Sequence, residues 1–267
     1  MAIAHQTEVL GAANTTTTNY DISITPAAAM NGVVVIIEQN AVTADQITSV
    51  TYGITTGAVP LSRAASPYGF ATDTTEAGGI YIYWGGDSTI WPSGAQTVRI
   101  VKTVAATNTR AAVATMTVAA GKVVALDNGG TGTSASVANP SWTHASLVNN
   151  VMAYLGIHSG LATMTNTPAT GWTLWPATTG FEDMGQQGRG WARLTSATNT
   201  AGSLGAGWTA STADDFVGCS ISFKEADPPP APPFDPPGLL QRSPRPSEQA
   251  QVAGPYAFTP PSTLLGG

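Results

Sequence analysis

The sequence has few charged residues and only one cysteine. Charged residues make up 10% of the 267 positions, well below the ~25% typical of soluble domains. Lysine and arginine are scattered singly, apart from Arg242 and Arg245, and the formal net charge is −6. Nucleic acids and anionic membranes are bound by clustered basic side chains, so neither is an expected partner. The single Cys219 excludes a disulfide within the chain and predicts a small core residue on an apolar strand.

Long hydrophobic runs are also missing. No eighteen apolar residues follow one another, so no transmembrane helix is predicted. The start, MAIAHQTEVLGAANTTTTNY, lacks the basic and apolar regions of a signal peptide, and synthesis in the cytosol is expected. Hydrophobic residues still make up 42% of the chain. Because disorder requires low hydrophobicity together with high net charge, most of the chain is expected to fold.

Proline is scarce up to residue 226 and abundant after it. Residues 1–226 contain seven prolines, and residues 227–267 contain the other twelve. Proline fixes φ near −65° and removes a backbone donor, so DPPPAPPFDPP (227–237) is expected to be extended and polyproline-II-like. A boundary near Ala226 therefore predicts a folded domain, 1–226, followed by an extended C-terminal arm, 227–267.

The first 226 residues consist of short apolar or alternating segments separated by Gly, Pro, Asn and Thr. Such segments are typical of β-strands, and no apolar stripe of helical period is sustained over three turns. The expected strands form two series. The first covers 20–25, 32–39, 47–53, 79–85, 96–104 and 110–118, and the second covers 148–159, 171–175, 188–195, 203–211 and 215–225.

Two of these segments predict how the strands are buried. GVVVIIEQ (32–39) is apolar without alternation, which indicates a central strand buried on both faces. In QTVRIVKTV (96–104), Val98, Ile100 and Lys102 share one mainly apolar face. One face of that strand should contact the core and the other should contact water.

The predicted fold class is all-β, an antiparallel β-sandwich or jelly roll followed by the proline-rich arm. The two series of strands could form two sandwiches. The segment between them, DNGGTGTSASVANPS (127–141), is expected to be only a flexible or edge-strand stretch. A single sandwich formed by residues 1–226 is therefore preferred.

Few residues are candidates for catalysis or metal binding. A glycosidase needs two carboxylates about 5–10 Å apart across a cleft, and the acid pairs Glu182–Asp183 and Asp214–Asp215 invite that hypothesis. Adjacent acids point in different directions, so each pair offers at most one catalytic group. Asp214 and Asp215 are also expected as turn residues before a strand.

Other motifs give no better support for an enzyme. His144 and His158 have no cysteine or carboxylate at metal-ligand spacing, and a polar strand edge and a turn are the favoured interpretations. DNGGTG (127–132) matches no phosphate-binding motif and is predicted to be a loop. Cys219 has no plausible activating partner. Neither a cofactor nor a metal is expected, and the protein is not expected to be an enzyme.

Tryptophan is the richest signal for ligand binding. Of the seven tryptophans, Trp91, Trp172 and Trp175 occupy turn-like segments, where an exposed indole can stack on a sugar ring. The tryptophans on predicted strands are better explained by packing between sheets. Glycan contact is therefore a hypothesis for these three positions.

The arm carries apolar side chains beyond its prolines. At ~3.1 Å per residue it could reach on the order of 100 Å when extended. We expect these side chains to be buried against another chain and exposed in the isolated monomer. They are Phe234, Leu239, Leu240, Tyr256, Phe258, Leu264 and Leu265.

The chain carries a characteristic succession of segments, in the order GVVVIIEQ, SVTYG, PLSR, IYIYWGGDSTIWPSGAQTVRIVKT, RAAVATMTV and DDFVGCSISFKE. Over residues 20–225 this succession resembles a β-sandwich domain of virion proteins from tailed bacteriophages. The chain departs from the family pattern at Ile54, where a second glycine is commonest after VTYG, and in its long loop between Arg63 and Gly79.

This resemblance implies a non-enzymatic structural component of the virion. A minor tail protein is favoured, and a capsid decoration is the other form. The implied partners are other virion structural proteins and copies of the chain itself, and the implied location is the virion, assembled in the host cytoplasm. A carbohydrate-binding module for host-surface glycans is the alternative, and a glycan-cleaving enzyme is a less favoured one.

Overall fold

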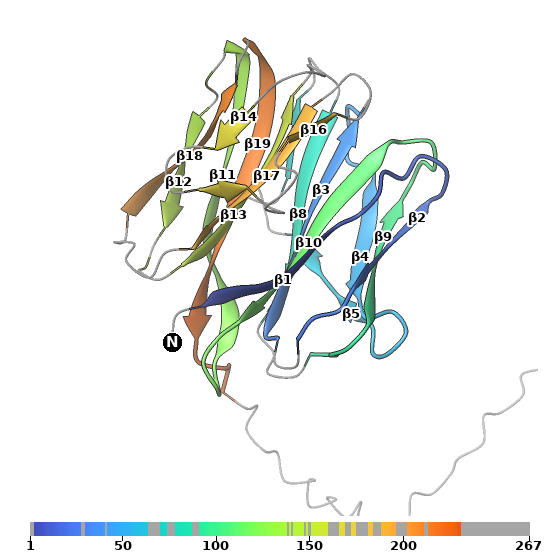
Figure 1. The fold of residues 1–267 in the computed structure, drawn as a ribbon, viewed down its shortest axis with the longest axis vertical. Helices are drawn as coiled ribbons and strands as arrows, with labels where there is room; N and C mark the ends of the chain where they lie inside the picture. Colours follow the sequence, from blue (N-terminus) through green and yellow to red (C-terminus); the bar gives the residue numbers. More distant parts are fainter. Residues whose placement is uncertain are drawn as a thin grey trace, which may run out of the picture. The chain divides into compact units, whose positions relative to one another are not determined.

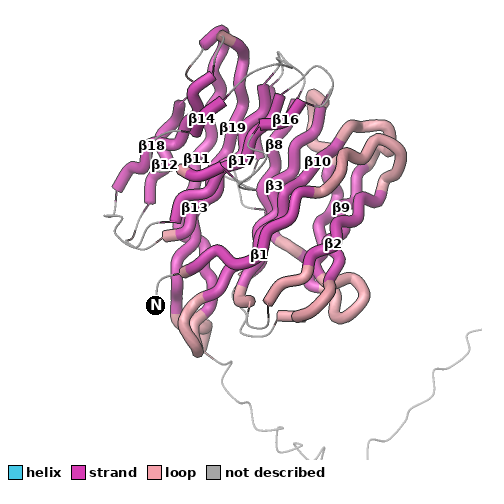
Figure 2. Tube along the Cα trace, viewed as in Figure 1, coloured by secondary structure: helices cyan, strands magenta, loops and turns pink. Residues whose placement is uncertain are grey.

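The computed structural model describes residues 3–230, apart from 28–29, 41, 64–69, 74–77, 87–90, 138, 140, 147, 149–150, 160–165, 169–171, 175–180, 184–187, 196–201 and 211–212. The described residues form antiparallel strands joined by turns and loops, with no helix among them (Figure 2). The predicted all-β class is therefore confirmed. The chain divides into two units, Met1–Pro229 and Pro230–Gly267, and only Pro230 of the second is described.

Nineteen strands are present in the described residues, and each of the eleven predicted strands overlaps one of them. The first series is β1 (Ala4–Leu10), β2 (Asn19–Ile24), β3 (Gly32–Asn40), β4 (Ile47–Tyr52), β5 (Val59–Pro60), β6 (Ser62–Arg63), β7 (Phe70–Asp73), β8 (Gly78–Gly85), β9 (Gln96–Lys102) and β10 (Thr109–Thr117). The second series is β11 (Val123–Val137), β12 (Ser141–Ser146), β13 (Met152–Ser159), β14 (Asn166–Pro168), β15 (Thr173–Leu174), β16 (Phe181–Asp183), β17 (Gly188–Thr195), β18 (Gly202–Ala210) and β19 (Asp214–Ala226).

These strands form four sheets. Sheet A has the order β1-β10-β3-β8-β6, with β7 also paired to β8, and sheet B has the order β2-β9-β4-β5. Sheet C has the order β11-β19-β13-β17-β15, with β16 also paired to β17, and sheet D has the order β12-β18-β14. Figure 1 shows the sheets following one another across the view, from β2, β4 and β9 on the right to β12, β14 and β18 on the left. Each sheet takes its strands from one series only.

Sheet A contributes to an apolar cluster on each of its faces. Every residue of β3 is buried, which confirms the prediction for GVVVIIEQ. Val33, Val35 and Ile37 point into the cluster shared with β2, β4 and β9 of sheet B. Val34 and Ile36 point into the cluster shared with β11, β13 and β19 of sheet C. Burying one such side chain fully stabilises the fold by about 1.5–3 kcal/mol, so both clusters hold β3 in place.

Strand β9 alternates between buried and half-buried residues, as its sequence predicts. Lys102 shares the buried face and is only 2% exposed. Its Nζ lies 2.9 and 3.2 Å from the side-chain and backbone oxygens of Asn14, 3.2 Å from the oxygen of Ala105 and 2.8 Å from that of Thr107. Burial lowers the pKa of Lys102, and these oxygens replace the water that the ammonium group has lost.

Replacing Lys102 by methionine is expected to lower the free energy of unfolding by about 1–3 kcal/mol, because buried carbonyl oxygens lose their donor while the aliphatic stem is retained. Lys122→Met is the matched control, since Nζ of Lys122 binds Asp227 at 2.6 Å on the surface and should matter much less. Urea unfolding of both variants measures the difference. Equal losses would contradict a structural role for the buried ammonium group.

The segment between the two series differs from the prediction. DNGGTG (127–132) was predicted to be a loop, and this is wrong, because these residues lie inside β11. Residues from Asn128 onward pair with β19, and Oγ of Ser222 accepts a hydrogen bond from the Asn128 backbone at 3.2 Å. The edge-strand interpretation of this region is confirmed, since β11 ends the order of sheet C. Within the described residues, no helix is long and apolar enough to span a bilayer.

Candidate functional site

A cluster of hydrogen-bonded polar side chains lies around β1. In the pairing of β1 with β10, His5 lies opposite Met116 and Glu8 lies opposite Ala114. Two residues of β1 therefore face the single Thr115, which defines a β-bulge. Residues three apart on a regular strand point to opposite faces. The bulge cancels that alternation and places His5 and Glu8 on the same side.

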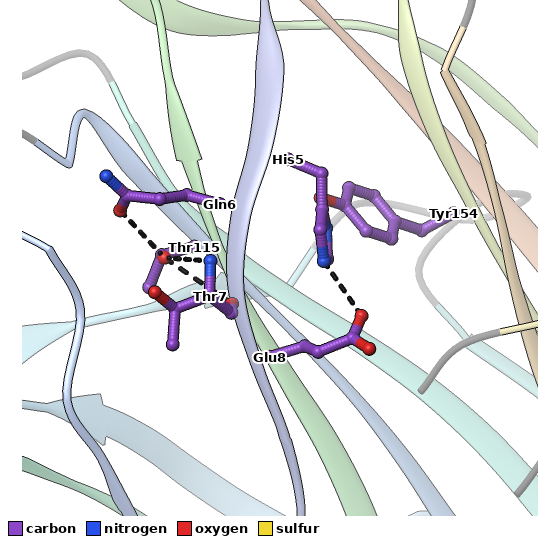
Figure 3. Close-up of polar contacts among 6 residues, drawn as sticks. All are labelled: His5, Gln6, Thr7, Glu8, Thr115 and Tyr154. Carbon is purple, nitrogen blue, oxygen red and sulfur yellow. Dashed lines mark hydrogen bonds and ion pairs between the residues drawn. The ribbon is translucent and has the colours of Figure 1, made fainter. Parts of the chain in front are cut away.

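On that side, a chain of hydrogen bonds runs from Glu8 through His5 to Tyr154 of β13 (Figure 3). Nε2 of His5 lies 2.8 Å from Oε2 of Glu8, and Nδ1 lies 3.0 Å from the hydroxyl oxygen of Tyr154. Both ring nitrogens are used whichever protonation state His5 adopts. A neutral ring accepts from the tyrosine and donates to the carboxylate, and an imidazolium donates to both.

The other side of the bulge is held by Thr115 (Figure 3). Its hydroxyl oxygen accepts a hydrogen bond from the backbone N–H of Thr7 at 3.2 Å and lies 3.2 Å from Oε1 of Gln6. The two bulged residues thus both bind the residue that they oppose. These hydrogen bonds supply partners for backbone and side-chain groups that the irregular strand pairing would otherwise leave without one.

A carboxylate, an imidazole and a hydroxyl in sequence are the parts of an acid–base relay. In this protein the hydroxyl belongs to Tyr154, which is fully buried, and the side chain of His5 is only 8% exposed. His5 and Tyr154 are thus largely shielded from solvent, whereas the side chain of Glu8 is 24% exposed. The arrangement is suited to fastening β1 of sheet A to β13 of sheet C.

A second polar pair joins the same two sheets. Nδ1 of His158 in β13 lies 2.8 Å from Oε1 of Glu38 in β3, and both side chains are fully buried. Arg110 lies directly opposite Glu38 in the pairing of β10 with β3, so its positive charge lies on the same face as the carboxylate. Gly78 makes room for the imidazole, since a Cβ atom at that position would collide with the ring.

A third pair lies on the other face of sheet C. Nδ1 of His144 in β12 lies 2.9 Å from Oγ of Ser220 in β19, and both residues are fully buried. Trp172 meets the imidazole edge-on, with the ring centroids 6.5 Å apart. Burial lowers the pKa of His144 to about 4, against an opposing effect of the nearby Asp127 charge. The histidine is therefore neutral at pH 7.

The histidine positions correct the sequence-based interpretation. A polar strand edge and a turn were expected for His144 and His158. Both lie on strands, so the turn is wrong, and neither histidine has any exposed surface. Their burial is made possible by Ser220 and Glu38, which supply hydrogen-bond partners from distant parts of the chain.

Two of the three tryptophans proposed for glycan contact are buried. Trp91 is 8% exposed and Trp172 is 7% exposed, so the expected exposure is wrong for both. The indole of Trp91 fills the cluster between sheets A and B, edge-on to Tyr52 at 5.7 Å, and the Tyr52 hydroxyl donates to the oxygen of Pro92 at 2.8 Å. Of the three positions, Trp175 remains a candidate for glycan contact, and it lies outside the described residues.

The remaining candidate acids lie on separate strands of sheet C, with β17 and β13 between them. Glu182 and Asp183 lie on the short strand β16, whereas Asp214 and Asp215 open β19. Cys219 is unpaired and buried, and burial raises the pKa of its thiol well above the usual value. Its prediction as a core residue is confirmed, because it belongs to the cluster between sheets A and C.

Other predicted sites cannot be placed on this structure. All seven apolar residues proposed for the arm, Phe234 to Leu265, lie outside the described residues. Among the residues that are described, no three or more His, Cys, Asp or Glu side chains are grouped as metal ligands. No protein-family model, curated protein or solved structure matches the chain.

Sequence reasoning missed the polar contacts between sheets A and C. His5 and Tyr154 are 149 residues apart, and Glu38 and His158 are 120 apart. The one local signal was Glu38 itself, a carboxylate at the end of the apolar run GVVVII, because a charge is rarely buried without a partner. That signal indicates a buried partner without saying which residue supplies it.

Proposed function

We propose that this protein is a non-enzymatic structural component of a tailed-phage virion. In this proposal, residues 1–226 form a jelly-roll-like β-sandwich displayed on the particle, and residues 227–267 anchor it to neighbouring subunits. A minor tail protein is favoured over a capsid decoration. The partners are other virion structural proteins and copies of this chain.

The observation that carries the proposal is the way the arm begins. Strand β19 ends at Ala226, which pairs with Val123, and Lys122 binds Asp227 at 2.6 Å. Residues 227–230 are exposed. The proline-rich segment therefore begins directly after a paired strand of the folded body. Proline lowers the entropy lost when a segment is ordered, and the apolar residues beyond it can fill grooves on a partner.

Burial of the chemistry-bearing side chains supports a structural role as well. Among these side chains, His144, His158, Cys219, Trp91 and Trp172 are buried in the core or between sheets. The apolar cluster between the facing sheets A and B supports a sandwich architecture. These buried residues stabilise the folded body. The apolar side chains of the arm are the ones proposed to contact other subunits.

Ending the chain after Pro230 is expected to reduce its incorporation into particles at least tenfold, while the melting temperature of the body stays unchanged. The truncation keeps the Lys122–Asp227 pair and removes only the proposed anchor. Quantitative mass spectrometry of purified particles, made with truncated or full-length chain, measures incorporation.

A full-length variant separates anchoring from chain length. Phe234→Ser, Leu239→Ser and Leu240→Ser together keep the prolines and remove apolar anchors, so they should also lower incorporation. Normal incorporation of the truncated chain would exclude the anchoring role. Loss with truncation but not with the serine variant would assign anchoring to the rest of the arm.

A further inference from the structure

Sheets A and C are built in the same way. In sheet A the first, tenth, third, eighth and sixth strands of the chain lie side by side in that order, with the seventh also on the eighth. In sheet C the order is β11-β19-β13-β17-β15, with β16 also on β17. The strands β11, β19, β13, β17 and β15 of sheet C therefore correspond to β1, β10, β3, β8 and β6 of sheet A, and β16 corresponds to β7. The corresponding strands also follow one another in the same succession along the chain.

Sheets B and D extend the correspondence. Sheet B runs β2-β9-β4 before β5, and sheet D runs β12-β18-β14. All the pairings are antiparallel in both series. Among the described residues, the two-residue β5 is the one strand without a counterpart. Antiparallel strands can be ordered in many ways, so recurrence of one order across two sheets indicates a shared origin.

We infer that the chain is an internal duplication, in which residues 4–117 and 123–226 are two copies of one β unit docked as a dimer within a single chain. The docking surface is the face of sheet A that carries Val34, Ile36 and Ile82, and the partner that fits it is the equivalent face of a second copy. This inference is independent of the proposed function.

The packing between sheets A and C is what such a dimer requires. The face of sheet A that is turned away from sheet B packs on sheet C, and the equivalent strands β3 and β13 contact each other there. Gly156 of β13 lies against Ile36 of β3 so closely that a Cβ atom would be 2.6 Å from Cγ2 of Ile36. The absence of a side chain at Gly156 allows the two central strands to approach.

The polar contacts between the copies make the docking specific. The bonds from His5 to Tyr154 and from His158 to Glu38 both cross from one copy to the other. A misaligned interface would leave these groups buried without partners. They therefore favour one alignment of two otherwise apolar faces.

The connection between the copies is short, and it touches the second copy through the backbone N–H of Ala119, which donates to Oε2 of Glu225 at 2.8 Å. Among the described residues, no strand pairing joins the two series. Gly121 in the connecting turn has φ +77° and nothing within 4 Å of where a Cβ atom would be. The turn can therefore accept an insertion, and the copies should stay together when it is cut.

Cutting this turn tests the inference. A protease recognition sequence is inserted between Ala120 and Gly121 of the full-length chain, and the folded protein is cleaved. We expect two fragments on a denaturing gel and a single peak in gel filtration at micromolar concentration, at the elution volume of the uncut chain. Separation or precipitation of the fragments on cleavage would overturn the inference.

A matched pair of variants locates the docking surface. Ile36 and Ile100 are both fully buried, Ile36 between sheets A and C and Ile100 between sheets A and B of one copy. Ile36→Ala should weaken association of the cut fragments at least tenfold, whereas Ile100→Ala should not release them. Equal release by both variants would overturn the assignment of the surface.

Discussion

Replacing Glu38 by alanine is expected to lower the free energy of unfolding by about 3–5 kcal/mol, because it removes one partner of a buried, hydrogen-bonded pair. The carboxylate lies 2.8 Å from Nδ1 of His158, and neither side chain is exposed. Without it, the imidazole has lost its acceptor and Arg110 has lost the charge opposite it. Denaturant unfolding at pH 7 measures the loss.

Glu8→Ala is the matched control for this prediction. Its carboxylate also lies 2.8 Å from a histidine nitrogen, that of His5, but the Glu8 side chain is 24% exposed. Water can replace part of that bond, so a loss of about 1 kcal/mol or less is expected. A double variant, Glu38→Leu with His158→Leu, should recover stability relative to Glu38→Ala. Similar losses for Glu38→Ala and Glu8→Ala would show that burial does not determine the effect.

The strands that could be predicted are those whose sequence records their burial. GVVVIIEQ has no polar position until its end, and β3 is buried on both faces. In β9 the alternation of Val98, Ile100 and Lys102 with more polar residues matches the alternation of burial. In both cases the pattern depends only on the strand and its own two faces.

Strands β11 and β12 could not be predicted in the same way. DNGGTG has low intrinsic strand preference, and its conformation depends on β19, which lies about ninety residues further along the chain. Such a pairing is decided by tertiary structure. The two series of strands were visible in the sequence, but their relation was not, because apolar alternation is similar in any half-buried strand. The order of strands in the sheets is what reveals the repeated unit.

The candidate sites illustrate the same limit. A turn-like sequence around Trp91 predicts exposure, yet the indole lies in the apolar cluster between sheets A and B. His144 and His158 looked like surface residues because no partner was near them in sequence. Their partners come from β19 and β3, which only the folded sheets bring close.

Lowering the pH from 7 to 4 is expected to remove about 3 kcal/mol of stability through His144 alone. Burial lowers the pKa of His144 from 6.5 to about 4 in the folded protein, and each pKa unit corresponds to about 1.36 kcal/mol. The unfolded chain binds a proton as the pH falls below 6.5, whereas the folded protein does not until about 4. Stability is therefore full above pH 6.5 and declines between pH 6.5 and 4.

His144→Gln tests this assignment, because glutamine can still hydrogen-bond with Ser220 but does not titrate. The free energy of unfolding, measured by urea denaturation at intervals from pH 7 to 4, should fall by about 3 kcal/mol less in the variant than in the wild type. Carboxylates that do not interact with His144 affect both proteins equally and cancel in the difference, whereas Asp127, whose charge acts on His144, does not cancel fully. Thr143→Gln, at an exposed neighbouring position on β12, should retain the wild-type slope of the free energy of unfolding against pH. If His144→Gln retains that slope too, the acid sensitivity comes from other groups, and His144 does not stay neutral between sheets C and D.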